Sequence, residues 1–62
     1  MISVNKERNS VIITGENSLE IATKIATRYD GHITKDHKTA GYTVKFDEGS
    51  FRRYLGDNDY ER

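Results

Sequence analysis

The chain has 62 residues, no cysteine, and ten basic against ten acidic residues, so its formal net charge is zero. One domain is the most that these residues can form, and neither a disulfide framework nor a thiolate site is available. The neutral total charge argues against a protein that coats nucleic acid without sequence preference, because such binding depends on neutralising many phosphates.

A domain of this size buries only about 60% of the surface that its unfolded chain exposes, so it depends on one small core or on a partner. No apolar run is long enough to cross a membrane, and the N-terminal residues lack the pattern of a secretory signal. We therefore expect a cytoplasmic protein with no membrane partner.

The first predicted element is a β-hairpin over residues 2–13, since both of its ends are rich in β-branched residues. With the turn at Glu7 and Arg8, four apolar side chains share one face and Ile12 lies on the opposite face. The four are Ile2, Val4, Val11 and Ile13.

A helix is predicted to follow, with Asn17 as its N-cap, Glu20 as the capping-box partner and Gly31 as a left-handed stop. Its apolar residues recur at the spacing of one helical face, which we expect to be buried. They are Ala22, Ile25, Ala26 and Tyr29.

A second hairpin is predicted over residues 32–46, with a turn over residues 36–39. This turn sets Ile33 opposite Tyr42, His32 opposite Thr43 and Lys35 opposite Ala40. One face then carries Ile33, Tyr42, Val44 and Phe46, and the other carries His32, Thr34, Thr43 and Lys45.

Asp47 is expected to cap a last helix that ends at Gly56, with Phe51, Tyr54 and Leu55 toward the core. The sequence thus predicts an α+β fold: a single small domain over residues 1–56, ordered ββαββα, with two helices packed on one face of an antiparallel four-stranded sheet. Residues 57–62 are expected to form a flexible acidic tail.

The two histidines, His32 and His37, are the residues most suited to metal binding or catalysis. Their spacing fits no recognised zinc pattern, and no motif supplies a nucleophile with an orienting group. We therefore expect no metal, no cofactor and no enzymatic activity, with a small ribonuclease-type enzyme as the third functional alternative.

The favoured function is that of a small non-catalytic binding protein (a regulator, inhibitor or accessory subunit) that docks on a larger protein, and an origin in a phage or mobile element would suit it. Its candidate contact residues are Ile12, Thr34, Thr43 and Lys45. A second copy of the chain could also cover an open face or pair with an edge strand.

The alternative is a nucleic-acid-binding module that uses the basic second hairpin and the last helix. Its candidate residues are His32, Lys35, His37, Lys38, Lys45, Arg52 and Arg53.

Overall fold

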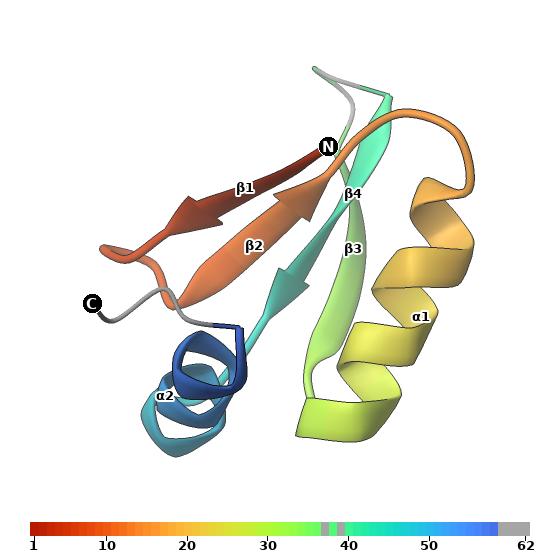
Figure 1. The fold of residues 1–62 in the computed structure, drawn as a ribbon. Coiled ribbons are helices and arrows are strands. Elements are labelled where there is room, and N and C mark those ends of the chain that lie inside the picture. Colours follow the sequence, from red (N-terminus) through yellow and green to blue (C-terminus); the bar gives the residue numbers. More distant parts are fainter. Residues whose placement is uncertain (37, 39, 59–62) are drawn as a thin grey trace.

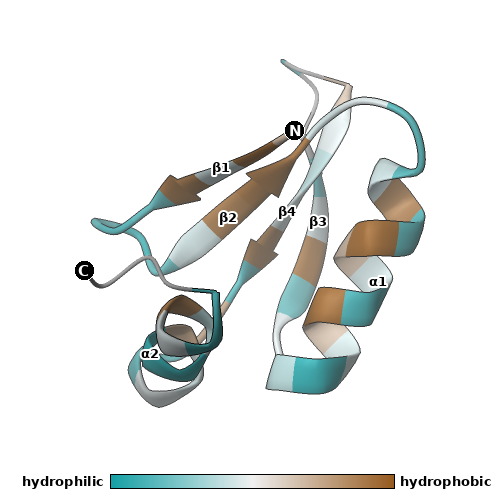
Figure 2. Cartoon of the chain, in the orientation of Figure 1, coloured by the Kyte–Doolittle hydropathy of each residue, from teal (hydrophilic) through white to brown (hydrophobic). Residues whose placement is uncertain are grey.

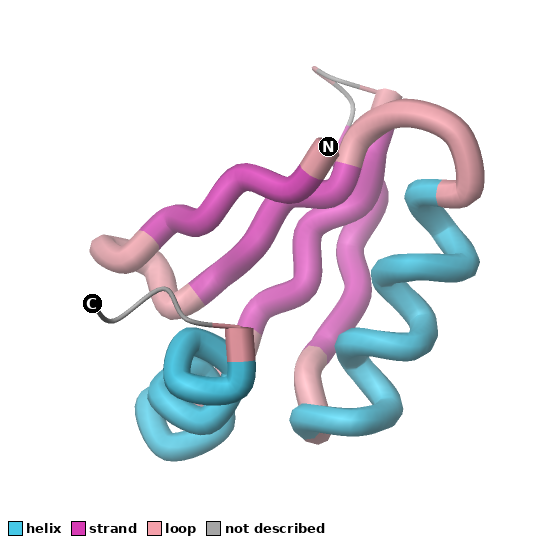
Figure 3. The backbone as a smooth tube through the Cα atoms, in the orientation of Figure 1, coloured by secondary structure: helices cyan, strands magenta, loops and turns pink. Residues whose placement is uncertain are grey.

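The computed structural model of the chain describes residues 1–36, 38 and 40–58. Figure 1 shows one sheet with both helices on the same side of it, and Figure 3 shows the same two layers along the backbone. The predicted ββαββα order and the antiparallel four-stranded sheet are confirmed. The elements are β1 (Ile2–Asn5), β2 (Ser10–Ile13), α1 (Ser18–Tyr29), β3 (His32–Asp36), β4 (Gly41–Lys45) and α2 (Glu48–Asp57).

The first hairpin has the predicted register, with Ile2 opposite Ile13 and Val4 opposite Val11. Its turn is held by Asn5, whose Oδ1 accepts hydrogen bonds from the backbone N–H groups of Glu7 at 3.1 Å and Arg8 at 3.3 Å. Asn side chains commonly mimic a backbone turn in this way, which explains how the turn forms without an Asn-Gly pair.

The strand order is β1-β2-β4-β3, so β2 and β4 are central and β1 and β3 are the two edges. Of the four strands, the central strand β2 carries the most apolar residues, as its hydropathy colouring shows in Figure 2. Val11, Ile13 and Val44 are fully buried beneath the helices. Burying these three side chains contributes to the hydrophobic stabilisation of the core.

The register of the second hairpin differs from the prediction by two residues. Ile33 lies opposite Val44, Lys35 opposite Tyr42, and His32 opposite Lys45. The difference arises because β3 continues to Asp36 and Ala40 takes a left-handed conformation with φ 58° before β4 begins. A shift of two keeps every side chain on its predicted face, since strand faces alternate with a period of two.

The ends of α1 also differ from the prediction. Asn17 is the N-cap, but it has a left-handed backbone (φ 63°) and its side chain makes no capping hydrogen bond, so there is no capping box with Glu20. Asp30, not Gly31, takes the left-handed conformation at the C-terminal end. A Cβ atom on Gly31 would lie 2.7 Å from Val44 Cγ1, so a close approach to β4 is what requires glycine there.

Asp47 caps α2 as predicted, since its carboxylate accepts a hydrogen bond from the backbone N–H of Ser50 at 2.7 Å. The helix runs past Gly56 to Asp57, one residue beyond the predicted end. Asp57 then accepts a hydrogen bond from the Tyr29 hydroxyl at 3.0 Å, so the first residue of the predicted tail belongs to the fold. Residues 59–62 of that tail lie outside the described residues.

Four aromatic rings join the two helices to the end of β4. Tyr29 meets Tyr54 edge to face at a centroid distance of 5.4 Å, and Phe46 stacks on Tyr54 at 5.5 Å. Phe51 lies 6.0 Å from Phe46. Such pairs add to the free energy gained by burying the rings, so this cluster anchors α2 to the rest of the domain.

Candidate binding surfaces

The face of the sheet turned away from the helices is the surface on which most of the sequence-predicted contact residues lie. We call it the open face. The strand registers set its side chains in two rows across the four strands. One row is Ser3, Ile12, Thr43 and Thr34, and the next is Asn5, Ser10, Lys45 and His32.

The structure brings together all four predicted protein-contact residues. Ile12 lies directly opposite Thr43, and Thr43 lies directly opposite Thr34. Lys45 is two residues along β4 from Thr43, on the same face. Ile12 and Thr43 are half-buried and Thr34 and Lys45 are exposed, so Ile12 is an apolar residue with polar cross-strand neighbours.

A hollow with a volume of about 540 Å³ lies over this face. Every charged residue among the described residues that line it is a cation: Arg8 from the first turn, and Lys35 and Lys38 from the second hairpin. Its remaining lining residues are Asn5, Ser10, Ile12 and Thr43. A concave surface lined by charges of one sign concentrates the electrostatic potential, so this cationic hollow suits an acidic partner.

Lys35 lines the hollow although strand alternation assigns it to the helix side, with Ile33. Because β3 is an edge strand, the long side chain of Lys35 can reach round the edge to the open face. The sequence pattern gave no signal for Arg8, since its place depends on the first turn and on how the two hairpins pack together.

The residues of the nucleic-acid alternative divide between two sides of the sheet. His32 and Lys45 are opposite each other on the open face. Arg52 and Arg53 are on α2, in the helical layer, and Arg52 forms an exposed ion pair with Glu48 at 3.7 Å. His37 lies outside the described residues. The described part of this residue set therefore forms no single surface.

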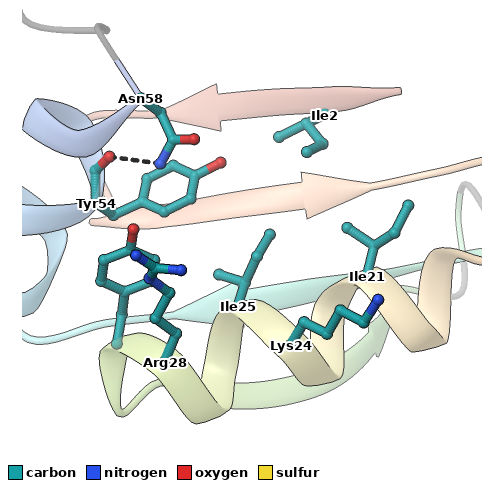
Figure 4. Close-up of a pocket in the computed structure, with 8 residues that line it drawn as sticks. Ile2, Ile21, Lys24, Ile25, Arg28, Tyr54 and Asn58 are labelled. Atoms are coloured by element: carbon teal, nitrogen blue, oxygen red, sulfur yellow. Dashed lines mark hydrogen bonds between the residues drawn. The ribbon is translucent and has the colours of Figure 1, made fainter.

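A second hollow, of about 270 Å³, lies on the helix side between α1 and β1, and we call it the β1 groove. Figure 4 shows Ile2 of β1 facing Ile21 and Ile25 of α1 across it. Lys24 and Arg28, also on α1, line it as well, and the remaining lining residues are Tyr29, Tyr54 and Asn58. Ile2 stays 36% exposed because β1 is an edge strand with little of α1 above it.

Metal and membrane features can be assessed only for the described ranges, 1–36, 38 and 40–58. Within them, no group of three or more His, Asp or Glu side chains is placed to hold a metal ion. In the same ranges, no helix has the length and apolar character needed to cross a membrane. The pKa of Asp47 is lowered by its hydrogen bond from the Ser50 backbone, which marks a helix cap.

Comparisons with protein-family models, with curated proteins and with solved structures found no match to this chain.

Proposed function

We propose that this chain is a non-catalytic cytoplasmic binding protein that docks its open face on an acidic surface of a larger protein. The observation that carries the proposal is the cationic hollow, which is lined by the apolar Ile12 together with Arg8, Lys35 and Lys38. Specific protein interfaces commonly have an apolar centre that loses its water and a polar rim.

The apolar and the charged residues around the hollow would have different roles in binding. Burying Ile12 and the methyl groups of Thr34 and Thr43 would supply the hydrophobic part of the affinity. The surrounding cations would speed association with an acidic partner and fix its orientation. Ile12 should therefore control how long the complex lasts, and the cations should control how fast it forms.

A protein partner is favoured over nucleic acid for three reasons. No aromatic side chain lines the hollow among its described residues, whereas sheets that bind single strands usually stack bases on exposed rings. The chain also has no net charge, and Arg52 and Arg53 lie in the helical layer. A cationic hollow can nevertheless attract phosphates, so nucleic acid is the second candidate in the experiment below.

The proposal is tested by capturing partners from an extract of the native host on tagged protein, after nuclease treatment. Wild-type protein should retain a defined acidic protein, and Ile12→Asp should weaken its binding by roughly 30-fold, as expected for a central interface residue. Leu19→Asp is the matched control, because Leu19 is an apolar residue 52% exposed on α1, in the other layer. Its binding should stay at the wild-type level.

The variant that combines Arg8→Glu with Lys35→Glu separates the two candidates. With a protein partner, it should slow association and leave a complex that salt affects only moderately. If nuclease removes the captured material, and a labelled oligonucleotide binds with a steep salt dependence that the charge reversals abolish, nucleic acid is the ligand and the proposal is wrong.

A further inference from the structure

Among the described residues (1–36, 38 and 40–58), no strand pairs with the outer edge of β1. Met1 and Thr14 exchange two hydrogen bonds: the N-terminal ammonium of Met1 donates to Thr14 O at 2.7 Å, and the Thr14 N–H donates to Met1 O at 2.9 Å. Hydrogen-bonded and non-hydrogen-bonded pairs alternate along an antiparallel ladder. Ser3 therefore bonds inward to Ile12, and the N–H and C=O groups of Ile2 and Val4 point outward from the sheet.

The two edges of the sheet differ in how they are protected. β3 carries Lys35, and a charged residue on an edge strand discourages further pairing. β1 has the sequence Ile-Ser-Val-Asn, without a charge, a proline or a glycine. Of the two edges, β1 is thus the one whose composition permits another strand to add.

We propose that β1 pairs with β1 of a second copy in antiparallel orientation, so that two chains share one eight-stranded sheet. In the register that sets Ile2 opposite Val4 of the second copy, both outward-pointing residues of each strand find a hydrogen-bonding partner. Two other registers differ from this one by a shift of two residues, and they set Ile2 opposite Ile2 or Val4 opposite Val4 of the second copy. In each of them, only one of the two outward-pointing residues has a hydrogen-bonding partner within β1. The two-fold axis then passes between the two Ser3 residues, and the interface is closed.

Side-chain chemistry is compatible with this pairing on both faces of the sheet. Ile2 and Val4 of both copies lie side by side on the helix face, where β-branched cross-strand pairs are favourable. Val4 of the second copy then extends the apolar wall of the β1 groove beside Ile2, which is 36% exposed in one chain alone. On the open face, only the small Ser3 side chains meet at the axis.

Long-range charge does not oppose the association, since each copy has zero formal net charge. In the wall of the β1 groove, Lys24 forms an ion pair with Glu20 of the same helix at 3.7 Å. A two-fold axis perpendicular to the sheet places the helices of both copies on one side, so both open faces point to the other side. The dimer would therefore leave the candidate docking surface accessible.

The test uses a single introduced cysteine, because the chain has none of its own. In Ser3→Cys, the two thiols lie directly opposite at a non-hydrogen-bonded pair, where Cβ atoms are about 4.5–5.5 Å apart. Oxidised glutathione, which accepts the two electrons and two protons, should join them rapidly into a disulfide-linked dimer. Thr34→Cys is the matched control, since the two copies of this exposed β3 residue would be separated by roughly 34 Å.

A second measurement does not depend on the disulfide. Wild-type protein should change from monomer to dimer with rising concentration in sedimentation velocity, and Ser3→Lys should remain monomeric because it sets like charges opposite each other at the axis. Ser3→Thr should dimerise like the wild type. Two results would overturn the proposal: wild-type monomer at every concentration, or disulfide formation no faster in Ser3→Cys than in Thr34→Cys. Growth into species larger than a dimer would equally contradict a closed interface.

Discussion

At the scale of single residues, glycine has a different physical effect at positions 31 and 56 of this chain. Gly31 is required because a Cβ atom would overlap Val44 and press on the Phe46 ring at 3.0 Å. Gly56 lies in α2 with no atom within 4 Å of its missing Cβ, so only its backbone entropy matters. The same substitution at these two positions should therefore have effects of opposite sign.

We expect Gly31→Ala to lower the free energy of unfolding by about 1–3 kcal/mol, because it overpacks the contact between the start of β3 and β4. Gly56→Ala should raise it by about 0.5–1 kcal/mol, the usual gain from replacing an unstrained helical glycine. Urea denaturation of the two variants beside the wild type measures both effects. Equal stability of the two variants would contradict the steric role of Gly31.

At the scale of elements, α2 depends on one side-chain cap. The Asp47 carboxylate accepts the Ser50 N–H at 2.7 Å, and this hydrogen bond lowers the pKa of Asp47 from its ordinary value of 3.8. A lowered folded-state pKa means that the ionised carboxylate favours the folded protein. The contribution is complete above pH 3.8, and it is lost as the pH falls through the lower folded-state pKa.

We therefore expect Asp47→Ala to lower the melting temperature at pH 7 and to change it little at the acid end of the range. Asp47→Asn keeps a hydrogen-bond acceptor and should retain most of the cap, while losing the acid dependence that belongs to this residue. Thermal melts followed by circular dichroism between pH 2 and pH 7 check both variants. A wild-type acid profile in Asp47→Asn would show that the carboxylate is not involved.

At the scale of the whole molecule, the docking surface and the dimer edge are adjacent, because Ser3 of β1 shares the open face with Ile12. The open face carries Ile12 and the cationic hollow, and the outer edge of β1 carries the outward-pointing backbone groups of Ile2 and Val4. Substitutions at neighbouring residues often affect each other, so variants of Ser3 and Ile12 give a strict test of whether the two surfaces act independently.

We predict that monomeric Ser3→Lys still captures the partner of the open face, because the central contact Ile12 is intact. Conversely, Ile12→Asp should bind that partner roughly 30-fold more weakly and still dimerise. Sedimentation velocity measures dimer formation and partner capture measures docking, and each is applied to both variants. If Ser3→Lys loses partner and dimer together, either Ser3 belongs to the docking surface or the partner recognises the dimer, and in both cases the two surfaces are one site.

Local patterns in the sequence determined the order of elements, the register of the first hairpin, the Asp47 cap and the face assigned to each strand residue. These follow from neighbouring residues, because side-chain alternation and capping act over a few positions. For the same reason, Ile12, Thr34 and Thr43 could be placed on one face before the strand order was known.

Only the tertiary structure decided which strands are central, the exact pairing of His32 with Lys45, and the steric need for Gly31. It also decided that Arg8 lines the same hollow as Lys35, from a different hairpin. Each of these depends on segments distant in the chain, and alternation with a period of two cannot separate registers that differ by two residues. Local pattern thus assigned residues to faces, and packing between hairpins decided which of them meet.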